Sequence, residues 1–426
     1  MKKFFVIFIL ILSYIKVQSQ DLQYARYIID SLCSQSFFGR AYTQNGAQNA
    51  SFFIAEEFSK INLNKFNDNY FQNYQISTNT LSNVLDVKIG KTHLKAGTDF
   101  MVSLSSPSVK GSYKVLLLDS SLIKTRKDFD KFLKKDLTKK IVLIDKQNIK
   151  DKDVIEFINS LRFNNPFKSA GLAFINDGKL SWGTSDGKKQ NNFFKINLLR
   201  NALPKKIKRI NLTIEAEFIK DYETRNVIGY CKGKIYPDSF FVFTAHYDHL
   251  GQMGKDVYFP GANDNASGTA MVMDLAKYYS ESRNQPDYSI VFVLVSGEES
   301  GLYGSHYLAE HPLFPLGNVK FLINLDMVGT GSEGITIVNG TKFEEQYKKF
   351  ERINKENGYL KAVVKRGESC NSDHCAFYEK GVPAIFIYAM GSEFAEYHNI
   401  YDVPHKLPLT KYNEIFRLLT DYIKSK

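Results

Sequence analysis

The sequence predicts an α/β protein with a mixed, mostly parallel central sheet covered by helices on both faces, together with a smaller β-rich inserted domain. From about Arg225 to the end, strand-like runs alternate with helical patterns, an order typical of α/β sheets. These runs are apolar at nearly every position, as expected for strands covered on both faces. Between about residues 91 and 220, short β-like runs are separated by turns rich in Lys, Asp and Ser.

The chain length indicates more than one domain, because single hydrophobic cores stop growing near about 250–300 residues and the chain has 426. Helical spacing of apolar residues predicts helices within 21–60, and a first strand is expected near 84–90. Four apolar strands are expected at 240–244, 289–295, 319–325 and 383–388. We therefore predict a discontinuous main domain, residues 20–90 and 221–426, interrupted by an inserted domain at residues 91–220.

The first 19 residues have the pattern of a secretory signal peptide. Lys2 and Lys3 precede an apolar run from Phe4 to Ile15, which is followed by Val17-Gln-Ser19. A basic start, a short apolar core and small residues before the cleavage point are typical of such signals. The run is shorter than the roughly 20 residues that a membrane-spanning helix needs. We expect an exported protein, periplasmic or secreted, cleaved near Ser19 and not inserted in a membrane.

Charge and cysteine content exclude some classes of function. The formal net charge is +11, but the basic residues are scattered and no basic patch interleaved with aromatics indicates nucleic-acid binding. Export permits disulfides, and Cys370 and Cys375 bracket a short loop. These two are the favoured pair, while unpaired thiols are the alternative, and the connectivity of Cys33 and Cys231 stays open. The spacing lacks the paired C-x-x-C pattern of a structural zinc site.

Metal-binding residue types follow three of the expected strands at the point where each ends. His246 follows the first strand, the pair Glu298-Glu299 the second, and Asp326 the third. In open α/β sheets, ligands bind beyond the carboxyl ends of the strands. Asp264 and His398 add a carboxylate and an imidazole from loops. Two imidazoles and four carboxylates are the ligand set of a two-zinc hydrolytic site with one carboxylate left to act as a base.

Each of these residues has a local role and an ordinary alternative. Asp248 lies two residues after His246 on an extended segment, hence on the same side, and fits a carboxylate that accepts the second ring N–H. Asp264 could bridge two metals, or it could cap the helix expected at 269–279. Of the two adjacent acids, one could bind metal while Glu298 or its neighbour faces the bound water; the alternative is a pair of solvated surface acids.

Asp326 and His398 depend most on context. Asp326 ends an apolar strand, where an unpaired buried charge is unfavourable and metal coordination relieves it. His398 lies in Glu396-Tyr-His-Asn-Ile-Tyr-Asp402 and alone carries little weight. Asp402 could orient this histidine or simply stabilise a turn.

The order H-x-D, D, E-E, D, H resembles that of the zinc-dependent M28 peptidases, which include bacterial and vacuolar aminopeptidases. The resemblance runs from about Asn226 to the end of the chain. Four phrases carry it: Ala245-His-Tyr-Asp-His249, Pro260-Gly-Ala-Asn-Asp-Asn-Ala-Ser-Gly268, Gly297-Glu-Glu-Ser-Gly-Leu-Tyr-Gly-Ser305 and Ser372-Asp-His-Cys-Ala-Phe377. Any one of them alone would be weak, but the combination is highly specific.

The resemblance implies a division of roles between two zinc ions. His246, Asp264 and Asp326 would hold one zinc, and Asp264, Glu299 and His398 the other. Glu298 would be the general base and acid, with Asp248 orienting His246. Residues 91–220 are similar to the protease-associated insert of some members. The implied activity is that of an aminopeptidase, in which a zinc-activated water attacks the first peptide bond of a peptide substrate.

Three other functions remain compatible with the sequence. A glutaminyl cyclase resembles these peptidases but works with one zinc, so His246 and Asp326 argue against it. A non-catalytic binding homologue should lack ligands, and none is missing. A carboxypeptidase-type member would need basic groups near the pocket, such as Arg366. Side-chain preference, oligomeric state and physiological substrate are not indicated by the sequence.

Overall fold

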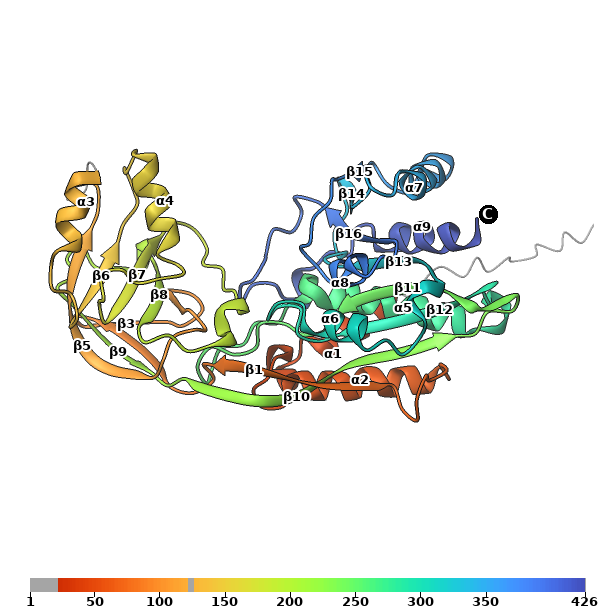
Figure 1. Cartoon of the computed structure of the whole chain (residues 1–426), viewed down its shortest axis with the longest axis horizontal. Helices are drawn as coiled ribbons and strands as arrows, with labels where there is room; N and C mark the ends of the chain where they lie inside the picture. The colour runs from red at the N-terminus through yellow and green to blue at the C-terminus, as the bar shows by residue number, and fades with distance from the viewer. Residues whose placement is uncertain (1–21, 122–125, 426) are drawn as a thin grey trace, which may run out of the picture.

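The chain folds into two lobes, each built on its own mixed sheet (Figure 1). This computed structural model describes residues 22–121 and 126–425. The predicted signal peptide, residues 1–19, lies outside the described residues. Within the described residues, no helix is long and apolar enough to cross a membrane.

The sheet of the first lobe has the strand order β1-β10-β12-β11-β13-β16-β14-β15. The pairs β1–β10, β10–β12 and β16–β14 are antiparallel, and the edge strand β15 pairs in parallel with β14. Neighbours from β12 through β11 and β13 to β16 run parallel. The four predicted apolar strands are these parallel ones, which confirms the expected mixed α/β fold. The strand bounds are β1 (Phe71–Thr80), β10 (Glu217–Cys231), β11 (Tyr236–His246), β12 (Tyr288–Val295), β13 (Val319–Leu325), β14 (Gly334–Val338), β15 (Val363–Lys365) and β16 (Ala384–Met390).

Helices cover both faces of this sheet because its central strands are apolar on both sides. Phe243 and Phe292 belong to the core on one face, whereas Val242 and Val291, their chain neighbours, belong to the core on the other. The first face is covered by α1 (Leu22–Leu32), α2 (Gly46–Lys60), α5 (Gly268–Ser280), α7 (Glu344–Asn357) and α9 (Tyr412–Lys424). The second is covered by α6 (Tyr303–Glu310) and α8 (His374–Glu379).

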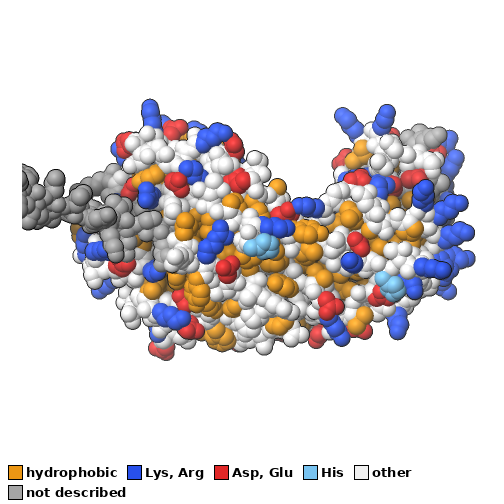
Figure 2. All heavy atoms as spheres, turned by 180° about the vertical axis from the view of Figure 1, so that it is seen from behind, with side chains coloured by type: hydrophobic (Ala, Val, Ile, Leu, Met, Phe, Trp, Pro, Cys, Tyr) orange, Lys and Arg blue, Asp and Glu red, His pale blue; other side chains and the backbone are white. Residues whose placement is uncertain are grey.

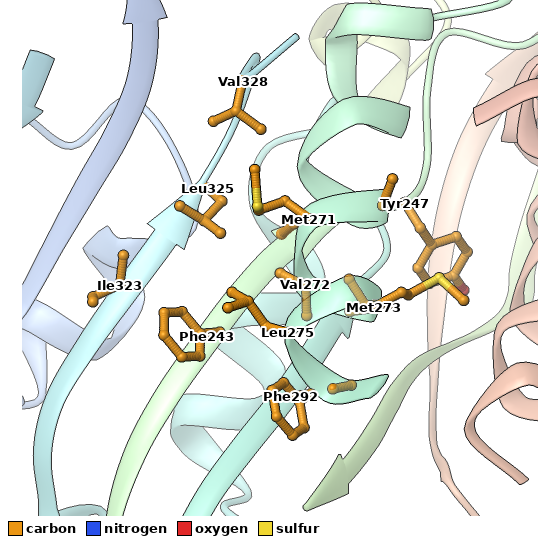
Figure 3. Packing of buried hydrophobic residues seen from close by; sticks show 14 of the residues in the cluster. Phe243, Tyr247, Met271, Val272, Met273, Leu275, Phe292, Ile323, Leu325 and Val328 are labelled. Atoms are coloured by element: carbon orange, nitrogen blue, oxygen red, sulfur yellow. The ribbon is translucent and has the colours of Figure 1, made fainter. Parts of the chain in front are cut away.

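Helix α5 is the central element of the larger core. Its side chains Met271, Val272 and Leu275 lie over Phe243 and Phe292 of the two middle strands (Figure 3). Burying side chains of this size stabilises the fold by roughly 1.5–3 kcal/mol each. The loop that carries Asp264 leads directly into α5. Packing of α5 against the sheet therefore also fixes the end of that loop.

The second lobe is a smaller sheet with the order β3-β2-β9-β5-β6-β7-β8-β4. Helices α3 (Arg126–Leu133) and α4 (Lys152–Ser160) cover one face. The core on the opposite face includes Leu250, Met253 and Phe259 of the first lobe, so this face joins the two lobes. The strand bounds are β2 (Leu85–Ile89), β3 (Thr92–Leu94), β4 (Phe100–Val102), β5 (Val109–Leu118), β6 (Lys140–Ile144), β7 (Gly171–Asn176), β8 (Phe194–Leu199) and β9 (Arg209–Ile214).

The sheet of the second lobe begins earlier in the chain than the predicted insert at residues 91–220. The strand expected near 84–90 is β2, and it pairs antiparallel with β9 in the second sheet. Its apolar side chains Val87 and Ile89 are buried in the core of that lobe. The alternation of buried and exposed residues marks a strand but not the sheet it joins, which is set by contacts with β9, more than a hundred residues later.

Cys370 and Cys375 form a disulfide, as favoured from their spacing. Cys33 and Cys231 are free and buried. The disulfide closes the loop just before α8, next to residues that contact the site described below. Lys and Arg side chains gather at the outer end of the second lobe, and the surface is hollowed between the lobes (Figure 2).

Candidate metal centre

Three neighbouring parallel strands bring the predicted residues to one edge of the sheet. His246 is the last residue of β11, Glu298 and Glu299 follow β12, and Asp326 follows β13. Because β11 lies between β12 and β13 and all three run parallel, their carboxyl ends meet at the same place. The loops carrying Asp264 and His398 reach this edge from elsewhere in the chain.

His246, Asp264 and Asp326 form the first cluster. The Nε2 atom of His246 lies 3.5 Å from Oδ1 of Asp264 and 3.5 Å from Oδ2 of Asp326. All three side chains are buried, and one ligand atom from each lies within 4.8 Å of the others. The Oδ1 atom of Asp326 is buried without a hydrogen-bond partner among the described residues. An unpaired buried carboxylate oxygen is unfavourable, and a cation between these groups would satisfy it.

His398, Glu299 and Asp264 form the second cluster. The Nε2 atom of His398 lies 3.0 Å from Oδ2 of Asp264 and 3.3 Å from Oε2 of Glu299. Asp264 therefore turns one carboxylate oxygen toward each histidine. The structure brings together all five residues predicted as metal ligands, and it places Asp264 between the two clusters.

The backbone around Asp264 is held by buried polar side chains. Asp264 lies in the turn Ala262–Ser267, where its own backbone and that of Asn265 are not helical, and the peptide bond between them is cis. The amides of Asn263 and Asp264 donate hydrogen bonds of 2.8 and 3.1 Å to the two carboxylate oxygens of Asp402. Asn265 donates to the carbonyl of Leu325, at the end of β13. Asp402 thus orients the Asp264 loop, a role different from the His398 contact considered from the sequence.

Asp248 contacts His246 mainly through its backbone. The Nδ1 atom of His246 lies 3.2 Å from the carbonyl oxygen of Asp248 and 3.8 Å from its carboxylate. The carboxylate instead accepts hydrogen bonds from the Glu298 amide, at 3.3 Å, and the Tyr42 hydroxyl, at 3.4 Å. Burial raises the pKa of Asp248 to about 7. The Asp248 side chain therefore ties the end of β11 to the turn that carries Glu298 and Glu299.

Glu298 lines the pocket together with His246, Asp264 and Asp326 but belongs to neither cluster. Within the part of the chain that the structure describes, its carboxylate makes no hydrogen bond or ion pair. Burial raises the pKa of Glu298 well above its usual range; His246 opposes this shift, and the charges of Asp373 and Glu299 add to it. A carboxylate in this position is free to exchange a proton with a molecule in the pocket.

Two residues close to the clusters were not predicted from the sequence. His249 is buried, and its Nδ1 atom lies 2.8 Å from Oε1 of Glu299, the oxygen that does not face His398. The Ser372 hydroxyl donates to Oδ2 of Asp326 at 3.1 Å. His249 lies three residues after His246, and this closeness in the sequence was the only indication that it could lie near the site. For Ser372, the only indication was its position in the segment 372–377, which resembles a motif of the M28 peptidases.

The second lobe also contacts the loops that carry His398 and Glu299, through residues 179–188, here called the contact segment. The Trp182 amide donates a 2.8 Å hydrogen bond to the carbonyl of His398. The Thr184 hydroxyl donates a 3.1 Å hydrogen bond to the carbonyl of Glu299. Both Trp182 and Thr184 are buried. Two of the five predicted ligands thus have their backbones held by the other lobe.

The donor atoms fit zinc. Each cluster offers one imidazole nitrogen and two carboxylates, with Asp264 shared, and zinc accepts such N and O ligands in four-coordinate sites that leave a position for water. The carboxylates are buried close together, and without cations their negative charges would repel one another. The nearby hydrogen-bond partners Ser372, His249 and Asp248 are of the kind that orient metal ligands.

Comparison with known proteins agrees with this geometry. Residues 226–423 match the model of peptidase family M28. This part of the chain belongs to peptidase family M28. It is 42% identical over 113 residues to a probable zinc metalloprotease of Pyricularia oryzae, covering 26% of this chain and 22% of the relative. It is 32% identical over 177 residues to aminopeptidase YwaD of Bacillus subtilis, covering 40% and 36%.

A solved structure extends the likeness in fold to both lobes. The structure of BSAP, a zinc aminopeptidase from Bacillus subtilis, superposes with a TM-score of 0.70 at 18% identity, covering 95% of this chain and 94% of that chain. At this identity the likeness concerns the fold. The sequence matches span only about a fifth to a third of the length of the curated relatives.

Proposed function

We propose that this M28 chain is an exported aminopeptidase that uses two zinc ions to remove the first residue of peptides. The observation that carries the proposal is the position of Asp264. Its two carboxylate oxygens face Nε2 of His246 and Nε2 of His398 at 3.5 and 3.0 Å. A carboxylate shared in this way is suited to bridging two metals, and each histidine has a further acid of its own.

The ligand assignment follows from these contacts. His246, Asp264 and Asp326 would hold one zinc, and Asp264, Glu299 and His398 the other. When bound, the metals supply Lewis acidity that activates water and polarises a carbonyl group. The protein contributes the fixed geometry: the Asp402 carboxylate holds the Asp264 loop, and His249 fixes the rotation of Glu299.

Glu298 would carry the proton. Its carboxylate lines the same pocket as the ligands and has no partner among the described residues, so it is available to accept a proton from the attacking water. The same carboxyl group would then donate that proton to the nitrogen of the departing peptide. A positioned acid–base group of this kind typically contributes about 10²- to 10⁴-fold in rate.

The sequence relatives are named as a zinc metalloprotease and an aminopeptidase, and the fold of a zinc aminopeptidase matches this chain with a higher TM-score, 0.70, than that of a glutaminyl cyclase from Bacteroides thetaiotaomicron, 0.53. A zinc aminopeptidase shares the fold over nearly the whole chain, and aminopeptidase YwaD is a sequence relative. A single-zinc glutaminyl cyclase would not need the cluster of His246 and Asp326 beside the one of His398. A non-catalytic homologue would not need an unpartnered Glu298 at the pocket. Export is proposed from the sequence of residues 1–19.

Metal counting together with one substitution tests the proposal. We expect purified protein to bind two zinc ions per chain and to release 4-nitroaniline from aminoacyl 4-nitroanilides. Glu298→Gln should keep both zinc ions and lose about 10²- to 10⁴-fold in kcat. One zinc per chain without amine release would contradict the peptidase assignment, and full activity of Glu298→Gln would contradict the role of Glu298. Export is tested by fractionation, in which the protein should leave the cytoplasm with residues 1–19 removed.

A further inference from the structure

Arg366 is a cation in the pocket that the proposed mechanism does not use. It directly follows β15, and its backbone is fixed on both sides: the amide donates to the carbonyl of Ile337 at 2.9 Å, and its carbonyl accepts from the Thr341 amide at 3.3 Å. Its side chain lines the same pocket, of about 320 Å³, as His246, Glu298 and Asp326. The backbone of Arg366 is therefore held by β14 and by the turn that follows it, while its side chain lines the pocket.

Among the described residues, the guanidinium group of Arg366 has no acidic partner. Among residues 22–121 and 126–425, no hydrogen bond or ion pair involves this side chain. The nearest acid along the chain, Glu368, instead accepts a 2.9 Å hydrogen bond from the Tyr378 hydroxyl. By contrast, the neighbouring Lys365 is paired with Glu344 at 2.9 Å. A guanidinium has five N–H donors in a fork that matches a carboxylate, and here the fork is available to a ligand.

The other walls of the pocket are suited to a short aliphatic stem. Met327 follows the ligand Asp326, Phe386 and Tyr388 come from β16, and Tyr397 stacks on the ring of His398 at 3.9 Å between centroids. Among the residues that line the pocket, the four carboxylates of Asp264, Glu298, Glu299 and Asp326 carry as much negative charge as two zinc ions would carry positive charge. Arg366 then remains as the charge that a bound substrate would meet.

We propose that Arg366 binds the side-chain carboxylate of the first residue of the substrate, so that the enzyme prefers peptides that begin with Glu or Asp. This inference rests on the proposed function, because it assigns a substrate class to the same site. The methylene groups of the acidic side chain would lie against Met327 and the aromatic side chains, and its carboxylate would reach the guanidinium.

The test compares substrates on the full-length, zinc-loaded protein. For the 4-nitroanilides of Glu, Gln, Leu and Lys, we expect the highest kcat/KM with Glu, at least about tenfold above Gln. Arg366→Gln should lower the ratio of kcat/KM for Glu to that for Leu by about 10- to 100-fold, the usual range for losing a charged hydrogen-bond partner. Arg366→Glu should reverse the preference toward Lys. Lys365→Gln, which removes the same charge one residue away, should leave the ratio as in the wild type.

A binding measurement gives a second readout. Isothermal calorimetry on the zinc-loaded wild type should show tighter binding of free glutamate than of glutamine, and Arg366→Gln should remove this difference. An unchanged Glu-to-Leu ratio in Arg366→Gln would overturn the inference while leaving the peptidase assignment intact. An effect of Arg366→Gln that follows a free C-terminal carboxylate, in Leu-Gly but not in its amide, would also overturn it. Absence of turnover with every aminoacyl substrate would overturn both proposals.

Discussion

Replacing Thr184 by Val should weaken zinc binding by the proposed ligand Glu299, although Thr184 itself is not a proposed ligand. The substitution keeps the shape of the side chain and removes the hydroxyl that donates to the carbonyl of Glu299 at 3.1 Å. Thr184 is 6% exposed and Glu299 is 8% exposed, so water would not replace this bond freely. The carboxylate of Glu299 faces His398 at 3.3 Å, and its position depends on the backbone that Thr184 holds.

The expected size of the effect follows from the lost hydrogen bond. Leaving a buried acceptor unsatisfied costs about 1–3 kcal/mol, which corresponds to roughly 5- to 150-fold in an equilibrium constant. Removing an outer hydrogen bond of a metal site typically lowers metal affinity by about 10- to 100-fold. We therefore expect the zinc proposed at Glu299 and His398 to bind about 10- to 100-fold more weakly in Thr184→Val, with the zinc proposed at His246 and Asp326 less affected.

Competition with a chromogenic chelator measures this affinity, and Thr184→Ser is the matched control because it keeps the hydroxyl. Thermal unfolding of both variants separates loss of metal from loss of fold. Equal zinc affinities for the Val and Ser variants would refute the argument that the second lobe positions Glu299.

Two further predictions concern groups behind the site. Arg40 is fully buried and donates to the carbonyls of Tyr247 and Gly261, at 2.7 and 2.9 Å, among others; Arg40→Met should lower the free energy of unfolding by more than about 3 kcal/mol because several buried acceptors lose their donor, and a denaturation midpoint like that of the wild type would contradict this. Burial lowers the pKa of His374 to about 4, whereas an unfolded histidine titrates near about 6.5. Stability from neutral His374 is thus complete above about pH 6.5 and is lost as pH falls toward 4, by up to about 3 kcal/mol; His374→Phe should flatten the pH dependence of the unfolding free energy over this window, and parallel curves for both proteins would exclude the effect.

The central strands and the residues at their ends could be predicted because their signals are local. The run Ser289–Val295 is apolar at nearly every position, and Glu298 and Glu299 follow it after a glycine turn. A buried parallel strand needs such a run, and its carboxyl end is where a site forms. Sequence position alone therefore predicts that His246, Glu299 and Asp326 lie close together.

The remaining features depend on contacts between distant segments. Asp402 lies close to His398 in the sequence, yet its carboxylate accepts hydrogen bonds from the backbone amides of Asn263 and Asp264. Thr184 and Trp182 reach the site from the other lobe, and nothing in their neighbourhood distinguishes them from ordinary loop residues. The sheet that β2 joins is likewise decided by β9. Such pairings carry no periodic signature, because they are set by how the lobes pack rather than by the segments themselves.

Trp182 and Thr184 donate hydrogen bonds to the backbones of His398 and Glu299. If these two residues bind zinc as proposed, attachment of the second lobe and occupancy of that site are thermodynamically linked. Coupling of this kind is reciprocal. If contact with the second lobe raises zinc affinity by some factor, bound zinc raises the equilibrium constant for docking of the lobe by the same factor. Removing the metal should therefore weaken the contact between the two lobes. Limited proteolysis around residues 179–188 should then be faster in the metal-free protein than in the zinc-loaded protein.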